Sequence, residues 1–510
     1  MRSLTKRIAL VDKPLFIATG IVLLLLVVPV SGSASSTGGF VTRSGGSFMP
    51  STSSIGTAPS RPSTRRAPAC AFRAAGHRVA GGTCPVAENR SVGVNGQVFK
   101  FGGALVPTDT PTPPPPSGSA SSTSGFVTRS GTQLMLNGST YRFSGGSPYW
   151  LPWGDATELA NAMTDAKAMN LKVLRVFASL QVGTTPSFTN GCQANQPGQT
   201  CWDSGAADKN PNSPGSATDM GSEGVYFQYW NGSAVAINTG ATGLNHLDAA
   251  VKAARDNGLR LLITFVDGWD YYGGTRQYCM WHNIASINQC PQFYTDTNMQ
   301  NDYKNYVSSI LNRTNTLTGV VYKNDPTIFG WDLANEPQID SATLATWANT
   351  MSNFVKGIDS NHLVAVGDTG VDWAALPDTT RLDQLLAVTN IDYASLHLYP
   401  YWGCGSSQSM VAAAVCDSNM TTLMNRAYTD GKPSVLMEFG ARPVDPTYTS
   451  DFLSLAQTAR TGYASGWIAW GMMAYSDISN AWMVSDFIFM NDGSQNDINL
   501  TSEAALINTP

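Results

Sequence analysis

The 510-residue sequence predicts an α/β fold, a (β/α)8 TIM barrel, from three observations. Short apolar runs recur along residues 126–510, and most are separated by stretches whose apolar residues lie three or four positions apart. Several runs end in polar or charged residues, as at Asn335-Glu336, where a strand gives way to a loop. Buried strands that alternate with amphipathic helices are typical of a parallel sheet, and eight such strands form a closed barrel.

The predicted strands are short and mostly apolar on both faces, as expected of a sheet covered by helices. They comprise residues 141–146, 171–177, 259–266, 328–333, 361–367, 391–400, 433–440 and 466–471. The spacing of apolar residues predicts helices over 157–170, 244–257 and 298–313. Residues 181–242 are rich in Gly, Ser, Asn and Pro, which predicts a long functional loop closed by a disulfide.

The N-terminus has the pattern of a secretory signal peptide, which we assign to residues 1–34. Four basic residues precede an apolar run at 15–30, and small residues follow at 31–35. The run is shorter than the ~20 residues that span a bilayer, although a signal anchor stays an alternative. We therefore expect a secreted, extracellular protein without stable membrane association.

Residues 35–125 form a Ser/Thr/Pro/Gly-rich arm and linker that we expect to be disordered. Residues 31–45 recur at 117–131 with a single change, Gly38 to Ser124, and residues 95–103 resemble 137–145 more weakly. We interpret this as a partial duplication of the first strand of the domain at 126–510. A cellulose-binding module is the alternative, but the arm has few aromatic residues and only two cysteines.

The composition excludes several classes of function. Charged residues make up 13 %, against a usual ~25 %, and the net charge is −5, so no basic surface is available for nucleic acid. Thirteen Trp and 10 % aromatic residues favour a carbohydrate-handling protein. The sequence has no closely spaced Cys or His cluster of the kind that binds metals, so we expect neither a metal nor another cofactor.

Eight cysteines fit an oxidising compartment. They occur as sequence neighbours, which suggests local disulfides across loops, although the sequence permits many connectivities. The neighbouring pairs are Cys70/Cys84, Cys192/Cys201, Cys279/Cys290 and Cys404/Cys416. Six N-glycosylation sequons, at Asn89, Asn137, Asn231, Asn312, Asn419 and Asn499, are compatible with a secreted glycoprotein.

Seven candidate site residues lie in or just after predicted strands, and in a barrel these ends meet at one face. They are Arg175, Asn335, Glu336, His397, Tyr399, Glu438 and Trp470. Two carboxylates at one face suit cleavage of a glycosidic bond, in which one protonates the leaving oxygen while the other attacks or activates water. The alternatives are solvent-exposed loop glutamates and, for Arg175, a purely structural ion pair.

Five large aromatic side chains follow the 259–266 strand. They are Trp269, Tyr271, Tyr272, Tyr278 and Trp281. Aromatic planes beside polar groups suit a sugar site, because the C–H face of a pyranose stacks on a ring. Ordinary packing beneath a loop would account for some of the five, and we single out Trp269 and Trp281 as substrate-binding candidates.

The motifs Asn335-Glu336-Pro337, His397-x-Tyr399 and Glu438-Phe-Gly440 resemble those of glycoside hydrolase family 5. Residues 293–337 and 269–281 are similar to the endo-β-1,4-mannanases of fungi and plants within that family, and the resemblance extends from residue 126 to the C-terminus. It implies hydrolysis of internal β-1,4-mannosidic bonds of mannan, glucomannan and galactomannan with retention. Asp332 and Met437 depart from the usual family pattern, which leaves subsite preference open.

The resemblance also implies a role for each candidate. Glu336 would be the acid/base and Glu438 the nucleophile, with Arg175 and Tyr399 orienting the latter. Asn335 would hold the sugar 2-hydroxyl, His397 would line the site and Trp470 would stack under the sugar. A family member acting on β-1,4-glucan and a non-catalytic carbohydrate-binding protein are the alternatives. The presence of both glutamates disfavours the second, and we expect a monomer whose partner is β-mannan.

Overall fold

The computed structural model divides the chain into two units, Met1–Thr110 and Pro111–Pro510. The structure describes residues 125–182, 225–269, 273–284, 290–369, 379–405, 410–442, 445–474 and 489–509, and the backbone at 92–94, 97–99, 188–189 and 192–193. The predicted signal peptide and most of the predicted arm lie outside these residues. Within the described part, no helix is both long and apolar enough to cross a membrane.

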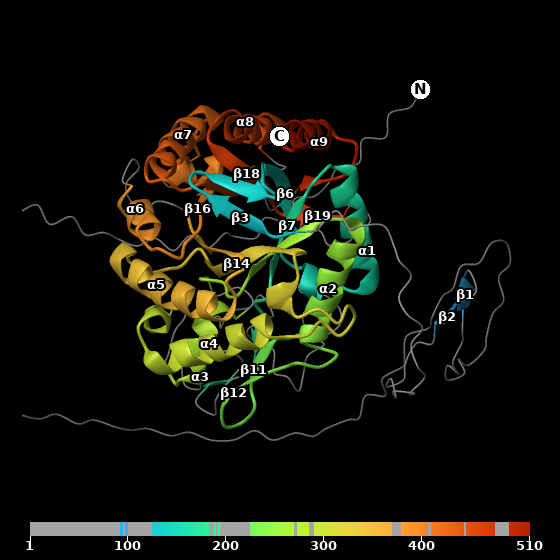
Figure 1. Cartoon of the computed structure of the whole chain (residues 1–510), viewed down its shortest axis with the longest axis vertical. Helices are drawn as coiled ribbons and strands as arrows, with labels where there is room; N and C mark the ends of the chain where they lie inside the picture. The colour runs from blue at the N-terminus through green and yellow to red at the C-terminus, as the bar shows by residue number, and fades with distance from the viewer. Residues whose placement is uncertain are drawn as a thin grey trace, which may run out of the picture. The chain divides into compact units, whose positions relative to one another are not determined.

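The larger unit contains an eight-stranded parallel sheet in the order β15-β14-β13-β7-β6-β18-β17-β16, with helices around it (Figure 1). Its strands are β6 (Phe143–Ser147), β7 (Val173–Phe177), β13 (Arg260–Thr264), β14 (Ile328–Asn335), β15 (Leu363–Gly367), β16 (Ala394–Leu398), β17 (Ser434–Phe439) and β18 (Ala464–Trp470). Each coincides with one predicted strand to within a few residues. The predicted (β/α)8 barrel is therefore confirmed.

Asp392 links the two strands at the ends of this order. Its backbone N–H donates to the Val364 carbonyl in β15 at 2.8 Å. Its carboxylate accepts from the Val364 N–H, also at 2.8 Å. Because β16 begins two residues later, these bonds join β15 to β16 where the regular ladder stops.

The helices cover the outside of the sheet. They are α1 (Ala156–Ala168), α2 (Leu244–Asn257), α3 (Gly274–Trp281), α4 (Thr297–Leu311), α5 (Ser341–Ile358), α6 (Thr380–Leu386), α7 (Ala413–Thr429), α8 (Tyr448–Thr461) and α9 (Gln495–Ile507). The helices predicted over 157–170, 244–257 and 298–313 are confirmed. Asp155 and Glu158 form a capping box at the start of α1, and α2 ends at Gly258, whose φ of 71° favours glycine.

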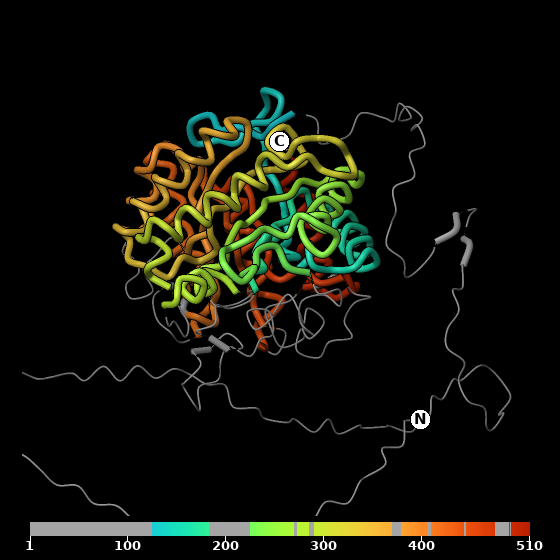
Figure 2. The backbone as a smooth tube through the Cα atoms, turned by 90° about the horizontal axis from the view of Figure 1, so that it is seen from below, coloured from blue at the N-terminus to red at the C-terminus, as the bar shows by residue number. Residues whose placement is uncertain are grey.

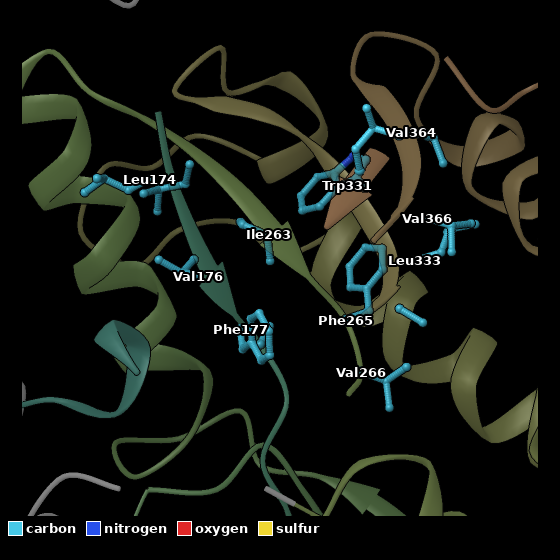
Figure 3. Packing of buried hydrophobic residues seen from close by; sticks show 14 of the residues in the cluster. Leu174, Val176, Phe177, Ile263, Phe265, Val266, Trp331, Leu333, Val364 and Val366 are labelled. Atoms are coloured by element: carbon cyan, nitrogen blue, oxygen red, sulfur yellow. The ribbon is translucent and has the colours of Figure 1, made fainter. Parts of the chain in front are cut away.

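Side chains along each strand alternate between the barrel interior and the helix layer. In β7, Val173 joins the interior cluster, whereas Leu174 and Val176 pack outward with the helices. Figure 3 shows the outward side chains of β7, β13, β14 and β15, including Leu174, Ile263 and Trp331. Arg175 has the same parity as Val173, which places a charged group inside the barrel and explains why it needs buried partners.

A three-stranded sheet lies at one end of the barrel, where Figure 2 shows it in cyan. It consists of β3 (Val127–Ser130), β4 (Gln133–Leu136) and β5 (Ser139–Thr140). Val127 and Leu134 are buried against interior residues near the start of the barrel strands, including Phe143 and Val173. The sheet thus covers the N-terminal end of the barrel, opposite the end at which the C-termini of the strands meet.

The smaller unit contains a two-stranded antiparallel hairpin, β1 (Val92–Val94) and β2 (Gln97–Phe99). The sequence between its strands is Asn95-Gly96, just as Asn137-Gly138 separates β4 from β5. The weak repeat found in the sequence therefore corresponds to a repeated hairpin.

The structure defines two disulfides, Cys279–Cys290 and Cys404–Cys416. The side chains of the other four cysteines lie outside the described residues. The long stretch at 181–242 contributes β8 (Gln181–Val182), β11 (Gln228–Trp230) and β12 (Val235–Ile237), which form one small sheet. Residues 274–281, which we expected in a loop, form α3, and all eight of its residues are buried.

Candidate active site

Glu336 and Glu438 meet at the C-terminal end of the barrel. Glu438 lies in β17, and Glu336 directly follows β14. One carboxylate oxygen of each, together with a nitrogen of His397, lies within 4.8 Å of the others. In an inverting glycosidase the two carboxyl groups are ~6.5–9.5 Å apart, which leaves room for a water molecule on the far side of the sugar ring. Glu336 and Glu438 are too close to each other for that arrangement. The separation fits the ~5–5.5 Å spacing of retaining glycosidases.

Both oxygens of Glu438 accept hydrogen bonds from buried donors. Arg175 Nη1 donates to Oε1, and the Tyr399 hydroxyl donates to Oε2 at 2.8 Å. These two contacts fix the carboxylate in one orientation. They also stabilise its ionised form, which is the form that can attack an anomeric carbon.

Arg175 itself is held by Asp332, and both side chains are 0 % exposed. Arg175 Nε and Nη2 donate to Asp332 Oδ2 at 3.2 and 2.8 Å. The same oxygen accepts from the Thr264 hydroxyl at 2.7 Å, and Oδ1 accepts from the Gly367 N–H at 2.6 Å. A Cβ at position 367 would lie 2.6 Å from Asp332 Oδ2 and 2.7 Å from Arg175 Nη2, so the pair requires glycine there.

Glu336 is contacted on both oxygens as well. Trp269 Nε1 donates to Oε2 at 2.8 Å, and His397 Nδ1 lies 2.8 Å from Oε1. The backbone of Glu336 has a φ of 40°, which is strained for a residue with a side chain. Its neighbour Gly268 donates to the Asn335 carbonyl at 2.6 Å, and a Cβ on Gly268 would lie 2.4 Å from the Glu336 carbonyl. Close backbone contact thus holds the Glu336 turn in place.

The Asn335 amide is held at both ends. Its Oδ1 accepts from Arg175 Nη2 at 2.8 Å, and its Nδ2 donates to Asp267 Oδ1 at 3.0 Å. An amide nitrogen carries two hydrogens, so one remains for a ligand. Asn335 is 6 % exposed, which leaves it at the edge of the site.

Burial shifts the pKa values of Glu336, Glu438 and His397. It raises the pKa of Glu336 from 4.5 to about 7, while the Trp269 hydrogen bond and the charge of Arg175 oppose the shift. Burial also raises the pKa of Glu438, although His397 and Arg175 work against it. The pKa of His397 falls to about 4, mainly through burial. At neutral pH His397 is therefore uncharged, and its contact with Glu336 is a hydrogen bond rather than an ion pair.

The remaining sequence candidates fall into two groups. Trp470 is half-buried at the end of β18 and stacks on Tyr149, with ring centroids 4.7 Å apart and planes at 9°. Trp281 is 2 % exposed and packs edge-on against Tyr278 in the hydrophobic core. Burial in α3 leaves Trp281 without an exposed ring face on which a sugar could stack. Ordinary packing, the alternative raised for the aromatic cluster, accounts for Tyr278 and Trp281.

Other residues of the site were not among the sequence candidates. Asp332 and Asp267 support Arg175 and Asn335 as described. Arg381 in α6 donates to the carbonyls of Pro337 and Ile339 at 2.8 and 2.7 Å and to both oxygens of Asp368 at 2.9 Å. It thereby ties the chain after Glu336 to the end of β15. An acidic residue within or just after an apolar run is a signal that applies to Asp332 and Asp267, but it does not show their partners, and no such signal identifies Arg381 in α6.

Glu336, His397 and Glu438 are also residue types that bind metal ions. Of the four carboxylate oxygens of Glu336 and Glu438, however, three already accept from Arg175, Tyr399 and Trp269, and the fourth contacts His397 Nδ1. A guanidinium charge and converging hydrogen-bond donors disfavour a divalent cation at this position. The arrangement suits acid/base and nucleophilic chemistry instead.

Comparison with known proteins agrees with this geometry. Residues 241–463 match the family described as GH family 5 beta-mannosidase-like. Mannan endo-1,4-beta-mannosidase A of Aspergillus aculeatus is 31 % identical over 339 residues, which are 62 % of this chain and 74 % of that protein. The enzyme of the same name from Hypocrea jecorina is 29 % identical over 68 % of this chain and 70 % of its own length.

A solved structure shares the fold over its full length. The endo-1,4-beta-mannanase of Rhizomucor miehei is 26 % identical, with a TM-score of 0.60, and the match covers 76 % of this chain and all of that one. With two carboxyl groups at the mouth of a (β/α)8 barrel and relatives of this kind, the chain belongs to the β-mannosidase-like enzymes of glycoside hydrolase family 5.

Proposed function

We propose that this protein is a retaining endo-β-1,4-mannosidase that hydrolyses internal bonds of mannan, glucomannan and galactomannan. The observation that carries the proposal is the pair Glu336 and Glu438, which have carboxylate oxygens within 4.8 Å of each other at the C-terminal end of the barrel. The names of the fungal relatives support mannan as the substrate. The geometry supports retaining cleavage of a glycosidic bond, but it does not identify the sugar. The reaction type and the substrate therefore need separate tests.

In the proposed mechanism Glu438 attacks the anomeric carbon and forms a covalent glycosyl-enzyme. Its contacts with Arg175 and Tyr399 favour the ionised, attacking form. Glu336 protonates the leaving oxygen, and its raised pKa of about 7 keeps it protonated at mildly acid pH. Once the negative charge of Glu438 is consumed, the pKa of Glu336 falls, and Glu336 then deprotonates the attacking water.

The other residues bind and orient the sugar. Asn335 has one amide hydrogen left for the 2-hydroxyl. The partly exposed ring of Trp470 offers a stacking surface at the end of β18. Trp269 contributes its N–H to Glu336, in addition to any contact with substrate. His397, whose side chain is fully buried, connects the two carboxyl groups rather than presenting a surface to the sugar.

Activity on a panel of polysaccharides tests the substrate. We expect the purified protein to depolymerise galactomannan, glucomannan and linear mannan, and to act at least ~100-fold more slowly on cellulose and xylan, a difference of about 2.7 kcal/mol in transition-state binding. Proton NMR of the first product from an aryl β-mannoside should show the β-anomer. Preference for cellulose would move the substrate to β-1,4-glucan, and an α-anomeric first product would contradict retention.

The pH profile tests the role of Glu336. We expect kcat/KM to decline above about pH 7, because the acid must be protonated and its pKa is about 7. In the folded state the pKa of Glu336 is about 7, whereas in the unfolded state it is near 4.5, so the folded state binds this proton more tightly. The contribution of Glu336 to the free energy of unfolding therefore decreases as the pH rises from 4.5 to 7. Glu336→Gln should therefore be more stable than the wild type above pH 7, and the difference should vanish below pH 4.5.

Glu503→Gln is the matched control for that profile. Glu503 is a buried glutamate of α9 bonded to Arg460 and lies outside the site. The alkaline decline of kcat/KM should be unchanged in this variant. An unchanged decline in a residually active Glu336→Gln variant would show that another group controls it.

We also propose that residues 126–510 form the catalytic domain, after a signal peptide at 1–34 that directs secretion and an arm at 35–125. A variant that begins at Gly125 should keep kcat/KM on soluble mannan within about tenfold. A variant that begins at Gly138 is the control. It loses the buried Val127 and Leu134 at the end of the barrel, and thermal unfolding should show a lower Tm. A greater than tenfold loss in the first variant would assign the arm to the catalytic unit.

A further inference from the structure

Beside Glu336, Glu438 and Asp332 the site contains a further carboxyl group, Asp267, to which the proposed mechanism gives no part. It lies three residues beyond β13 and is 2 % exposed. Its Oδ1 accepts from Asn335 Nδ2 at 3.0 Å and from the Trp269 N–H at 3.3 Å. One oxygen atom of Asp267 therefore contacts both the Asn335 amide, which we propose binds the sugar, and the backbone of Trp269, whose indole N–H donates to Glu336.

The backbone of Asp267 is fixed independently of this carboxyl group. Its N–H donates to Ser179 Oγ at 3.1 Å, and its carbonyl accepts from the Thr275 N–H at 2.8 Å. Ser179 Oγ in turn donates to Gln181 Oε1 at 3.1 Å. The backbone of Asp267 is thus bonded to the segment after β7 and to the first turn of α3. The carboxyl group is therefore held in a fixed position beside the Asn335 amide.

The contacts of Asn335 determine which end of its amide is oxygen. Arg175 can only donate, so Asn335 Oδ1 faces Arg175. Nδ2 then donates one hydrogen to Asp267 Oδ1. Because the amide group is planar, this bond also fixes the direction of the second hydrogen on Nδ2. Without an acceptor at Asp267 the Asn335 amide would keep a single anchor and could rotate about it, which would spread the remaining hydrogen over several directions.

We propose that Asp267 is a positioning residue for the reaction, and that it acts by fixing the Asn335 amide so that its free hydrogen points to the sugar 2-hydroxyl. The inference rests on the proposed function, in which Asn335 binds that hydroxyl. It assigns Asp267 no contact with the substrate.

Burial raises the pKa of Asp267 to about 8, so at neutral pH its carboxyl group is largely uncharged. The role therefore depends on a carbonyl-type acceptor at this place and not on a charge. An asparagine provides the same acceptor with nearly the same shape, whereas an alanine provides none.

The test compares Asp267→Ala with Asp267→Asn on two substrates, an aryl β-mannoside and its 2-deoxy analogue. For the mannoside we expect kcat to fall on the order of tenfold to a hundredfold in the alanine variant, with KM little changed, because the 2-hydroxyl contact strengthens in the transition state. Asp267→Asn should stay within about threefold of the wild type. For the 2-deoxy analogue the alanine variant should lose almost nothing relative to the wild type. An equal loss on both substrates, or no loss on either, overturns the proposal.

A second measurement removes the dependence on one variant. In an Asn335→Ala background, Asp267→Ala should cost nothing further on the mannoside, since it acts through the missing amide. An additive loss contradicts the inference. Should Asp267→Ala fail to fold, Asp267→Ser takes its place in both comparisons, as its shorter side chain does not reach Asn335.

Asp325→Ala is the control for general destabilisation. Asp325 is another buried aspartate, at the start of β14 and so at the opposite end of the barrel, where it caps the Thr327 N–H. It should lower the Tm while kcat on both substrates stays unchanged. If the wild type cleaves an aryl β-glucoside and not the mannoside, the proposed substrate is wrong, and the glucoside with its 2-deoxy analogue then tests Asp267 in the same way.

Discussion

Replacing Glu438 by alanine is expected to reduce kcat on mannan by on the order of 10³-fold or more, at least about 4 kcal/mol of transition-state stabilisation. The variant loses the attacking oxygen but keeps Arg175 and Tyr399, which both point at its position. Those donors now surround a space suited to a small anion. Added azide should occupy it and restore turnover of an aryl β-mannoside with a good leaving group.

The stereochemistry of the rescued product distinguishes the two glutamates. In Glu438→Ala, azide displaces the aryl oxide from the α face in a single inversion, which gives the α-mannosyl azide. In Glu336→Ala the nucleophile remains and forms the covalent intermediate from such a substrate without a proton. Azide then attacks that intermediate from the vacated β face, and two inversions give the β-mannosyl azide.

The controls are matched in shape. Glu438→Gln removes the charge but fills the space, so azide should not rescue it. NMR identifies the anomer of the mannosyl azide, and the rate of aryl oxide release measures the rescue. Exchanged anomers would exchange the roles of Glu336 and Glu438, and full activity in either alanine variant would place the chemistry elsewhere.

The barrel could be predicted from the sequence because its strands are buried on both faces. Residues 328–333 are largely apolar because β14 has the barrel interior on one side and α-helices on the other. The sheet at the N-terminal end was missed for the opposite reason. Its strand β3 exposes Thr128, Arg129 and Ser130 and buries Val127, which leaves too few apolar residues for a pattern.

The reactive pair could be predicted as well, since Glu336 and Glu438 each break an apolar run at its C-terminal end. Their supporting residues could not. Asp332 lies inside the apolar run of β14, and nothing local shows that its partner is Arg175, 157 residues earlier. Trp281 was a site candidate because it belongs to the aromatic cluster that follows residues 259–266, but it lies in α3 and is buried in the hydrophobic core. Contacts between distant segments decide these cases.

The pair Arg175–Asp332 allows the fold and the chemistry to be separated. Arg175→Met leaves Asp332 as an uncompensated carboxylate at 0 % exposure, and we expect a loss of about 3–5 kcal/mol in the free energy of unfolding. Adding Asp332→Asn removes that charge; the amide oxygen still accepts from the Gly367 N–H, and the amide nitrogen can donate to the oxygen of the Thr264 hydroxyl. The double variant should therefore regain most of the stability, as measured by denaturant unfolding.

Activity should not return with stability. The double variant still lacks the guanidinium that donates to Glu438 Oε1 and Asn335 Oδ1, so both the attacking carboxylate and the amide lose their orientation. We expect kcat on an aryl β-mannoside to stay at least about 100-fold below the wild type in both variants, some 2.7 kcal/mol in the barrier. Recovery of kcat in the double variant would mean that Arg175 acts only through folding. A single variant as stable as the wild type would contradict the expected cost of leaving the Asp332 carboxylate buried and unpaired.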